Sequence, residues 1–319
     1  MLSPLNGRPS WPVASFHVSR LGVSHDHGIR RGGGRRSGPM KAEQLTDPVA
    51  YHGEGPVWSE TWGGLRWVDM LDGDVMSLGD DGSIERRHVD EIAALVRPRR
   101  GGGAVLAIER GFALEEPDGT LNRLGDLWTG DDIRMNEGGC DPDGRLYCGT
   151  MAYDKRLGAA SVYRLDPDRT VSVVLEGVTI SNGLDWSPDG SVAYYIDTPT
   201  HQISVFDSDK GLTERRTFVE IPGDQGGPDG LVVDEQGGIW VALFGGSAVR
   251  RYTAEGMLDE VVEVGARQVT ACAFGGADLD RLYITTSREN LEPDDDPLAG
   301  SLFTVVPGVS GLPVRAFAG

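Results

Sequence analysis

Cysteine is scarce in this sequence. The 319 residues include only Cys140, Cys148 and Cys272, and no two of them form a Cys-x-x-Cys pair. An odd number of cysteines without that spacing argues against a disulfide framework and fits a reducing compartment. We therefore predict buried, unreactive thiols and a cytoplasmic protein.

Long hydrophobic runs are also missing. An uninterrupted aliphatic stretch such as Ala104–Ile108 is far shorter than the ~18 residues that a membrane-spanning helix requires. No long window shows the 3.6-residue periodicity of a helix. Glycine, in contrast, is abundant: its 46 residues are more than twice a typical share of ~7%. With 39% hydrophobic residues, the composition favours a folded, turn-rich β protein.

Basic residues are few outside the first forty positions. Residues 1–40 hold six arginines and one acidic residue, which leaves 24 basic and 48 acidic residues in positions 41–319. Such an acidic surface repels phosphate backbones and anionic headgroups, so we predict binding to neither nucleic acid nor membrane. Small neutral ligands and cations remain as partners. The sequence is compatible with a monomer or a small homo-oligomer.

We interpret residues 1–40 as a basic, disordered N-terminal extension. The pair Arg30-Arg31 is similar to a twin-arginine signal at first, but no apolar segment of ~7–15 residues follows it before Met40. The fold is therefore expected in residues 41–319.

A short strand-like segment after a turn recurs six times in residues 41–319. The copies begin 39 to 47 residues apart, at Gly64, Gly103, Gly144, Gly190, Gly237 and Asp280. A repeat of ~40–50 residues is typical of one four-stranded propeller blade, and a second hairpin turn follows each copy. We predict an all-β, six-bladed β-propeller with four antiparallel strands per blade. A two-domain β-sandwich is the structural alternative.

A polar residue directly before glycine recurs upstream of these turns, where each innermost strand should begin. The dipeptides are Glu54-Gly55, Glu137-Gly138, Asn182-Gly183 and Asp229-Gly230. Each alone is a common turn sequence. At blade spacing, however, equivalent positions of the inner strands converge on the propeller axis. Carboxylate and amide oxygens without His or Cys suit Ca²⁺, Mg²⁺ or Mn²⁺ more than a structural Zn²⁺ site, so we predict a cation site in the channel.

Other catalytic signatures are absent from the sequence. It contains no Gly-x-Ser-x-Gly elbow, no His-Glu-x-x-His motif and no phosphate-binding loop of the Walker type. Three histidines of the fold stand alone in the sequence, and we interpret each as a surface or packing residue. They are His52, His88 and His201.

Several motifs, in chain order, resemble those of the senescence marker protein/gluconolactonase/regucalcin family. They are Glu54-Gly-Pro-Val-Trp58, Arg134-Met-Asn136-Glu-Gly, Gly149-Thr-Met151, Ser181-Asn-Gly-Leu-Asp-Trp186, Pro228-Asp-Gly230 and Cys272-Ala-Phe-Gly-Gly276. The resemblance spans nearly all of residues 41–319. It implies a six-bladed propeller that holds one divalent cation in its channel and hydrolyses sugar lactones.

The resemblance also implies roles for individual residues. The cation ligands would be Glu54, Asn182 and Asp229, in agreement with the spacing argument. Two ligand carboxylates and one amide would leave positions for a water and a lactone carbonyl. Asp229 is then the candidate general base. We expect Ca²⁺ first, with Mg²⁺, Mn²⁺ or Zn²⁺ as alternatives.

Substrate contacts are implied for Arg134 and Asn136, with a salt bridge from Arg134 to Asp131 or Asp132 as the structural alternative. Two further residues depart from the family pattern. Glu137 stands where the family usually has Asp, and Asp154 supplies the acid, often Glu, that follows Gly-Thr-Met. We expect both at the substrate.

Two other functions remain open at this stage. A related cation-dependent enzyme could hydrolyse aryl esters or phosphotriesters, because the same ion polarises either oxygen. A propeller could also bind calcium without catalysis, although a pure binder would not need Arg134 and Asn136 beside the ion.

Overall fold

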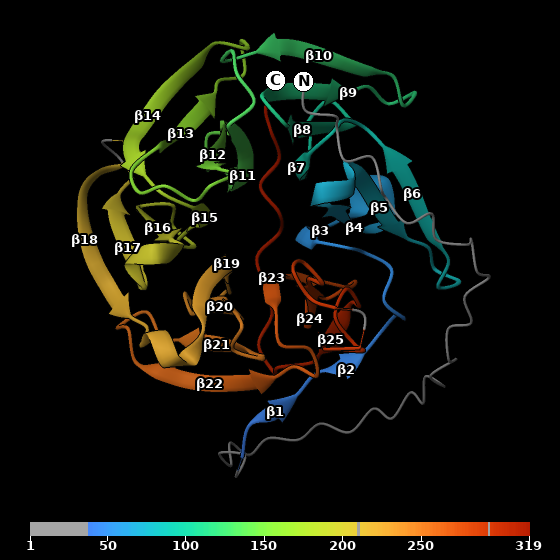
Figure 1. The fold of residues 1–319 in the computed structure, drawn as a ribbon, viewed down its shortest axis with the longest axis vertical. Coiled ribbons are helices and arrows are strands. Elements are labelled where there is room, and N and C mark those ends of the chain that lie inside the picture. Colours follow the sequence, from blue (N-terminus) through green and yellow to red (C-terminus); the bar gives the residue numbers. More distant parts are fainter. Residues whose placement is uncertain (1–37, 209–210, 293) are drawn as a thin grey trace, which may run out of the picture.

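The structure is a computed structural model that describes residues 38–319, apart from 209–210 and 293. These residues form six β-sheets arranged as blades around a central axis (Figure 1). The predicted six-bladed all-β propeller is therefore confirmed. Most of the predicted extension, residues 1–37, lies outside the described residues.

The first three blades follow each other along the chain, and each runs from the axis outward. Blade 1 contains β3 (Gly53–Ser59), β4 (Gly64–Asp69), β5 (Asp74–Leu78) and β6 (Ile84–His88). Blade 2 contains β7 (Ala93–Pro98), β8 (Ala104–Ile108), β9 (Gly111–Glu115) and β10 (Leu121–Asp126). Blade 3 contains β11 (Ile133–Cys140), β12 (Leu146–Ala152), β13 (Ala160–Leu165) and β14 (Val171–Val178).

The last three blades include the closure of the ring. Blade 4 contains β15 (Ser181–Trp186), β16 (Val192–Asp197), β17 (Gln202–Asp207) and β18 (Thr213–Glu220). Blade 5 contains β19 (Gly227–Val233), β20 (Ile239–Phe244), β21 (Ala248–Tyr252), β22 (Leu258–Glu263) and, paired in parallel to β22, β1 (Met40–Lys41). Blade 6 contains β23 (Val269–Gly275), β24 (Arg281–Thr286), β25 (Phe303–Val305) and β2 (Glu43–Gln44).

The ends of the fold meet in blade 6. Strand β2 from the N-terminal side pairs antiparallel with β25, so the outermost strand of the last blade comes from the start of the fold. This pairing joins the two ends of the fold in one blade and closes the ring. Blade 5 departs from the prediction of four antiparallel strands, because β1 adds a fifth, parallel strand.

The six turn-strand copies in the sequence are the second strands of the six blades: β4, β8, β12, β16, β20 and β24. Four short 3-10 helices lie in connections: η1 (Glu60–Trp62), η2 (Met70–Asp72), η3 (Thr198–Thr200) and η4 (Gly223–Gln225). No helix in the described part of the chain is long and apolar enough to cross a membrane.

The core is formed where apolar side chains of neighbouring blades pack against each other. Trp67, Trp186 and Trp240 are among the largest fully buried side chains. The three cysteines are free, buried thiols, as predicted. Burial raises the pKa of the Cys140 and Cys148 thiols to about 12, which keeps them protonated and inert. The cytoplasmic location stays a prediction.

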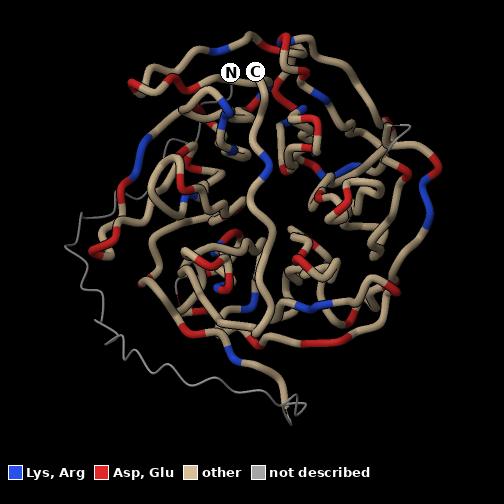
Figure 2. Tube along the Cα trace, turned by 180° about the vertical axis from the view of Figure 1, so that it is seen from behind, with Lys and Arg blue, Asp and Glu red and all other residues tan. Residues whose placement is uncertain are grey.

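The C-terminal segment after β25 crosses the middle of the ring, on the side at which the inner strands end (Figure 2). Gly311 bridges to Asp234 of blade 5, and Arg315 donates to the Asp185 carboxylate of blade 4 at 3.1 Å. Phe317 then pairs with Arg99, beyond the end of β7 in blade 2. One end of the axial channel is therefore spanned by this C-terminal segment.

Candidate metal centre

Near the start of each inner strand, the ladder with the second strand is irregular. In β15, Ser181 pairs with Asp197 and Leu184 with Tyr195, so that two residues face one on the partner strand. Bulges with the same two-against-one arrangement occur in β11, β19 and β23. A bulge re-aims side chains locally, and here the first bulge residue is Asn136 in β11, Asn182 in β15, Asp229 in β19 and Thr270 in β23.

The register corrects one part of the dipeptide pattern. Asn136, not Glu137, is equivalent to Asn182 and Asp229, and Glu137 occupies the second bulge position. Glu54 pairs with Val68 directly before the bulge of β3. The dipeptide pattern misaligned Glu137 because a bulge adds a residue that sequence spacing alone does not reveal.

The glycines after Asn182 and Asp229 are required by close packing between blades. A Cβ atom on Gly183 would lie 2.6 Å from the backbone nitrogen of Leu231, and one on Gly230 would lie 2.5 Å from the Cβ of Ala271. Each glycine therefore lets the next inner strand approach. The Asn182-Gly183 and Asp229-Gly230 dipeptides are therefore inter-blade packing sites rather than hairpin turns.

A chain of hydrogen bonds joins the polar side chains of blades 3 and 4. Arg134 Nη1 donates to Asn136 Oδ1 at 2.7 Å, and Asn136 Nδ2 donates to Asn182 Oδ1 at 2.9 Å. All three side chains are buried. The alternative salt bridge of Arg134 is not formed, because Asp132 pairs with Arg156 and Arg134 has no carboxylate ion pair among the described residues. The structure thus brings these three predicted site residues together.

Glu54 and Asp229 are buried carboxylates that influence each other. Burial raises the pKa of both well above the usual range, and the charge of Glu137 raises both further. Glu54 also raises the pKa of Asp229, while the guanidinium of Arg134 lowers both. Among the described residues, no Lys or Arg forms an ion pair with either carboxylate. Arg134 is thus close enough to influence both carboxylates, but neither has a directly paired basic side chain among the described residues.

His52 lies next to Glu54 and was missed as a site residue in the sequence. Its Nδ1 is 2.7 Å from Ser287 Oγ, and its Nε2 is 3.8 Å from Glu54 Oε1. Burial lowers the pKa of His52 to about 3, so the ring is neutral. Ser287 Oγ also accepts from the Glu289 backbone N–H at 2.9 Å. The sequence did contain a signal for this residue. His52 and Glu54 are two positions apart, and this spacing places both side chains on one face of a strand.

The structure does not bring Asp154 to the other predicted residues. Its side chain is 61% exposed, and Arg156 Nη1 lies 3.0 Å from its carboxylate. The preceding residue, Tyr153, approaches instead: its ring centre is 6.0 Å from the Arg134 guanidinium carbon, and its hydroxyl donates to Glu109 at 3.1 Å. The role of Asp154 at the substrate stays a prediction, and Tyr153 is the neighbour that the motif comparison missed.

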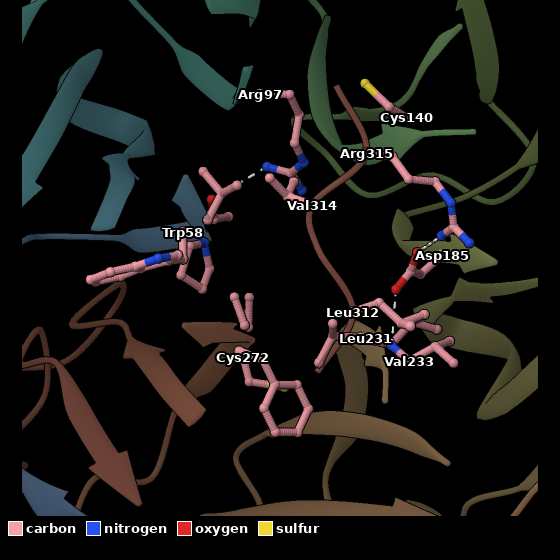
Figure 3. A pocket seen from close by; sticks show the side chains of 18 of the residues that line it. Trp58, Arg97, Cys140, Asp185, Leu231, Val233, Cys272, Leu312, Val314 and Arg315 are labelled. Atoms are coloured by element: carbon pink, nitrogen blue, oxygen red, sulfur yellow. Dashed lines mark hydrogen bonds and ion pairs between the residues drawn. The ribbon is translucent and has the colours of Figure 1, made fainter. Parts of the chain in front are cut away.

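Glu137 borders an axial cavity of about 90 Å³, on the side of the C-terminal segment. Figure 3 shows this cavity with Arg97, Asp185 and Arg315 among its walls. Glu137 is buried, and its Oε2 has no hydrogen-bond partner among the described residues. Burial raises its pKa to about 7, although Arg97 lowers it. The Glu137 carboxylate is thus close enough to Glu54 and Asp229 to raise their pKa values. It faces the axial cavity, however, whose lining does not include Glu54 or Asp229.

The donor set fits a divalent cation. Within the described residues, no group of three or more His, Cys, Asp or Glu side chains is placed to hold a metal ion. The candidate set instead comprises two carboxylates, Glu54 and Asp229, and the amide oxygen of Asn182. Hard oxygen donors of this kind suit Ca²⁺, Mg²⁺ or Mn²⁺, and a bound cation would supply a counter-charge.

Residues 52–288 match the family described as the SMP-30/gluconolactonase/LRE-like region. The chain belongs to this family. The match includes all inner strands and their bulges, so the family resemblance predicted from the motifs is confirmed.

Individual relatives agree with this assignment. The chain is 35% identical to regucalcin of Danio rerio over 292 residues, which are 88% of this chain and 99% of the relative. It is 36% identical to a 6-deoxy-6-sulfogluconolactonase of Pseudomonas putida over 276 residues, covering 84% and 95% of the two chains. Among solved structures, the calcium-binding protein regucalcin of Agrobacterium tumefaciens superposes with a TM-score of 0.82 at 27% identity, over 88% and 98% of the two chains.

Proposed function

We propose that this protein is a divalent-cation-dependent lactonase that opens sugar lactones. The observation that carries the proposal is the pair of buried carboxylates, Glu54 and Asp229, that lack a basic partner and lie with Asn182 and Arg134 at the inner-strand bulges. Membership of a family that includes a sugar lactonase supports the choice of reaction.

Glu54, Asn182 and Asp229 would hold the cation, for which Ca²⁺ is the first candidate because one relative with the same fold is a calcium-binding protein. When bound, the cation would polarise the lactone carbonyl and make an attacking water more acidic.

The protein's own groups have defined tasks in this proposal. Asp229 accepts the proton of the attacking water as the new C–O bond forms, since a carboxylate next to the nucleophile can act as general base. The ring C–O bond of the lactone then breaks, and the leaving oxygen takes a proton to become a hydroxyl. Arg134, held by Asn136, donates to substrate hydroxyls and stabilises the developing negative charge.

The test is hydrolysis of D-glucono-δ-lactone and a panel of aldonolactones, followed by acid release at constant pH. The protein is first stripped of metal and then supplied with Ca²⁺, Mg²⁺, Mn²⁺ or Zn²⁺. We expect acid release only with added cation. Cation-dependent hydrolysis of phenyl acetate or paraoxon but of no lactone would replace the proposal with an esterase or phosphotriesterase. Cation binding without any turnover would leave a calcium-binding propeller.

A further inference from the structure

The backbone carbonyls directly before the three proposed cation ligands share an unusual feature. Each lies on an inner strand, which has a ladder partner on only one edge, so its carbonyls on the other edge need another donor. In all three cases this donor is a side chain of the preceding blade. The pairs are Thr270 Oγ1 to Gly53 O at 2.6 Å, Asn136 Nδ2 to Ser181 O at 2.8 Å and Thr198 Oγ1 to Pro228 O at 2.8 Å.

Thr198 has the most informative contacts of the three. It begins η3, and its hydroxyl accepts a hydrogen bond from Asn182 Nδ2 at 2.7 Å while donating to Pro228 O. One hydroxyl can do both, because it has one proton and two lone pairs. It therefore connects the ligand of blade 4 to the residue that precedes the ligand of blade 5, Asp229.

The contact with Thr198 also fixes which way the Asn182 amide faces. With Nδ2 directed to the threonine hydroxyl, Oδ1 is left on the opposite side, where it accepts from Asn136 Nδ2. Two independent neighbours thus specify the same orientation. Only the oxygen of an amide can bind a cation, so this orientation is the one that a metal site requires.

Thr270 performs the equivalent contact between the last and first blades. It occupies the first bulge position of β23, in register with Asn182 and Asp229, and it is completely buried. Its hydroxyl donates to the carbonyl of Gly53 and lies 2.9 Å from Thr285 Oγ1. Blade 6 therefore places a hydroxyl where blades 4 and 5 place a ligand, and this hydroxyl holds the backbone next to Glu54.

We propose that Thr198 and Thr270 are positioning residues of the cation site, and that each acts by holding a ligand-bearing strand through a hydrogen bond across a blade boundary. This inference rests on the proposed cation site. Partners outside the ligand sphere commonly change metal affinity by ~10- to 100-fold when they are removed. The threonine hydroxyls are such partners.

The experiment measures Ca²⁺ and Mn²⁺ affinity by calorimetry, together with kcat and KM for D-glucono-δ-lactone. The variants are Thr198→Val, which keeps the shape but removes the hydroxyl, and Thr198→Ser, which keeps the hydroxyl. The same two substitutions are made at Thr270. Thr46→Val is the matched control, because Thr46 Oγ1 accepts a buried hydrogen bond from Leu302 N beside the pairing of β2 with β25.

We expect Thr198→Val and Thr270→Val to weaken cation binding by about 10-fold or more, and to lower kcat more than they raise KM. The serine variants should stay within about threefold of the wild type, since the hydrogen bond is kept. Thr46→Val should lower the melting temperature without changing cation affinity. Thr198 is half-buried, so Thr198→Val is expected to fold even if Thr270→Val does not. In that case Thr198→Val and Thr270→Ser are the variants that test the proposal.

Wild-type cation affinity in both valine variants would overturn the positioning role and leave the proposed function intact. Equal loss of affinity in valine and serine variants would also overturn it, because the hydroxyl would then be irrelevant. A wild-type protein that binds no cation would overturn this inference and the proposed function together.

Discussion

The carboxylates at the two ends of the axial channel differ in whether a basic side chain pairs with them. Where the inner strands end, half-buried Asp185 pairs with Arg315 at 3.1 Å and buried Asp234 pairs with Arg251 at 2.6 Å, whereas Glu137, beside the axial cavity, has no ion pair among the described residues. Where the inner strands begin, Glu54 and Asp229 have no Lys or Arg partner among the described residues. Removing a carboxylate from water is costly unless it is paired.

The presence or absence of a basic partner distinguishes carboxylates that stabilise the fold from the carboxylates that we propose to be functional. Asp234 also accepts from Trp240 Nε1 and Gly238 N, so its charge organises the turn after β19. Asp229 lies five residues earlier, within β19, and has no comparable set of donors in the part of the chain that the structure describes. Burying a carboxylate without a partner costs free energy, and strongly perturbed groups of this kind are typical of functional sites. The comparison therefore supports the proposal that a cation binds at the end at which the inner strands begin.

The largest expected effect comes from removing a charge at that end. Glu54→Gln and Asp229→Asn should each abolish tight cation binding and lower kcat/KM for the lactone by about 10³-fold or more, because loss of a general base alone costs ~10²–10⁴-fold. Calorimetry and acid release measure the two effects.

Asp185→Asn is the control for these two substitutions. It removes a half-buried carboxylate from the opposite end of the channel, so it should lower the melting temperature but keep cation affinity. Loss of cation affinity in Asp185→Asn as well would remove the distinction between the two ends.

Metal removal should expose a pH dependence of stability. The folded-state pKa of Glu137 is raised from 4.5 to about 7, and those of Glu54 and Asp229 are raised in the same direction. A raised acid pKa means that the folded state binds protons more tightly than the unfolded state, so stability is present below pH 4.5 and is lost as the pH rises towards 7. Glu137 alone corresponds to a loss of about 3 kcal/mol.

Urea unfolding of the metal-free protein between pH 4.5 and 7.5 measures this loss. Saturating Ca²⁺ should reduce it, and the effect of Ca²⁺ should be greater at pH 7 than at pH 4.5. Stability of the metal-free protein that is constant or increases over this range would show that the carboxylates are not held in a desolvated cluster.

Arg134→Ala should have a smaller effect than loss of a ligand. A lost hydrogen bond between a charged group and a substrate hydroxyl costs ~1.5–3 kcal/mol, or roughly 10- to 100-fold in kcat/KM. Cation affinity should change far less than in Glu54→Gln or Asp229→Asn, because Arg134 contacts Asn136 rather than a proposed ligand carboxylate. Arg134→Lys keeps the charge but not the planar donor group, and it should recover only part of the activity.

The smallest effects are expected from the two departures from the family pattern. Glu137→Asp changes a buried side chain that faces the axial cavity but shares the β11 bulge with Asn136. Through Asn136 it should alter the preference among lactone ring sizes more than the rate on any one lactone. Asp154→Glu should change the ring-size preference and the rate by no more than about twofold each, since the Asp154 carboxylate is exposed and paired with Arg156. A substrate profile altered by Asp154→Glu would establish the contact that the motif resemblance implies.

The sequence was sufficient for the blade count because each second strand follows a turn of its own, and the six turns recur at blade spacing. It also predicted Glu54, Asn182 and Asp229 as cation ligands from their motifs, and this assignment stays a prediction. The equivalence of Asn136 with Asn182 could not be predicted, because it depends on where each bulge adds a residue. Thr198 and Thr270 were not found for a similar reason: their partners, Pro228 and Gly53, are brought close only by the ring.

The most direct test of the account is a crystal structure of the protein soaked with Mn²⁺, with an anomalous difference map collected at the manganese edge. We expect one strong peak on the axis, coordinated by carboxylate oxygens of Glu54 and Asp229 and by Oδ1 of Asn182, on the side of the ring at which the inner strands begin. A peak in the axial cavity beside Glu137, or no axial peak at a concentration that supports lactone hydrolysis, would contradict the account.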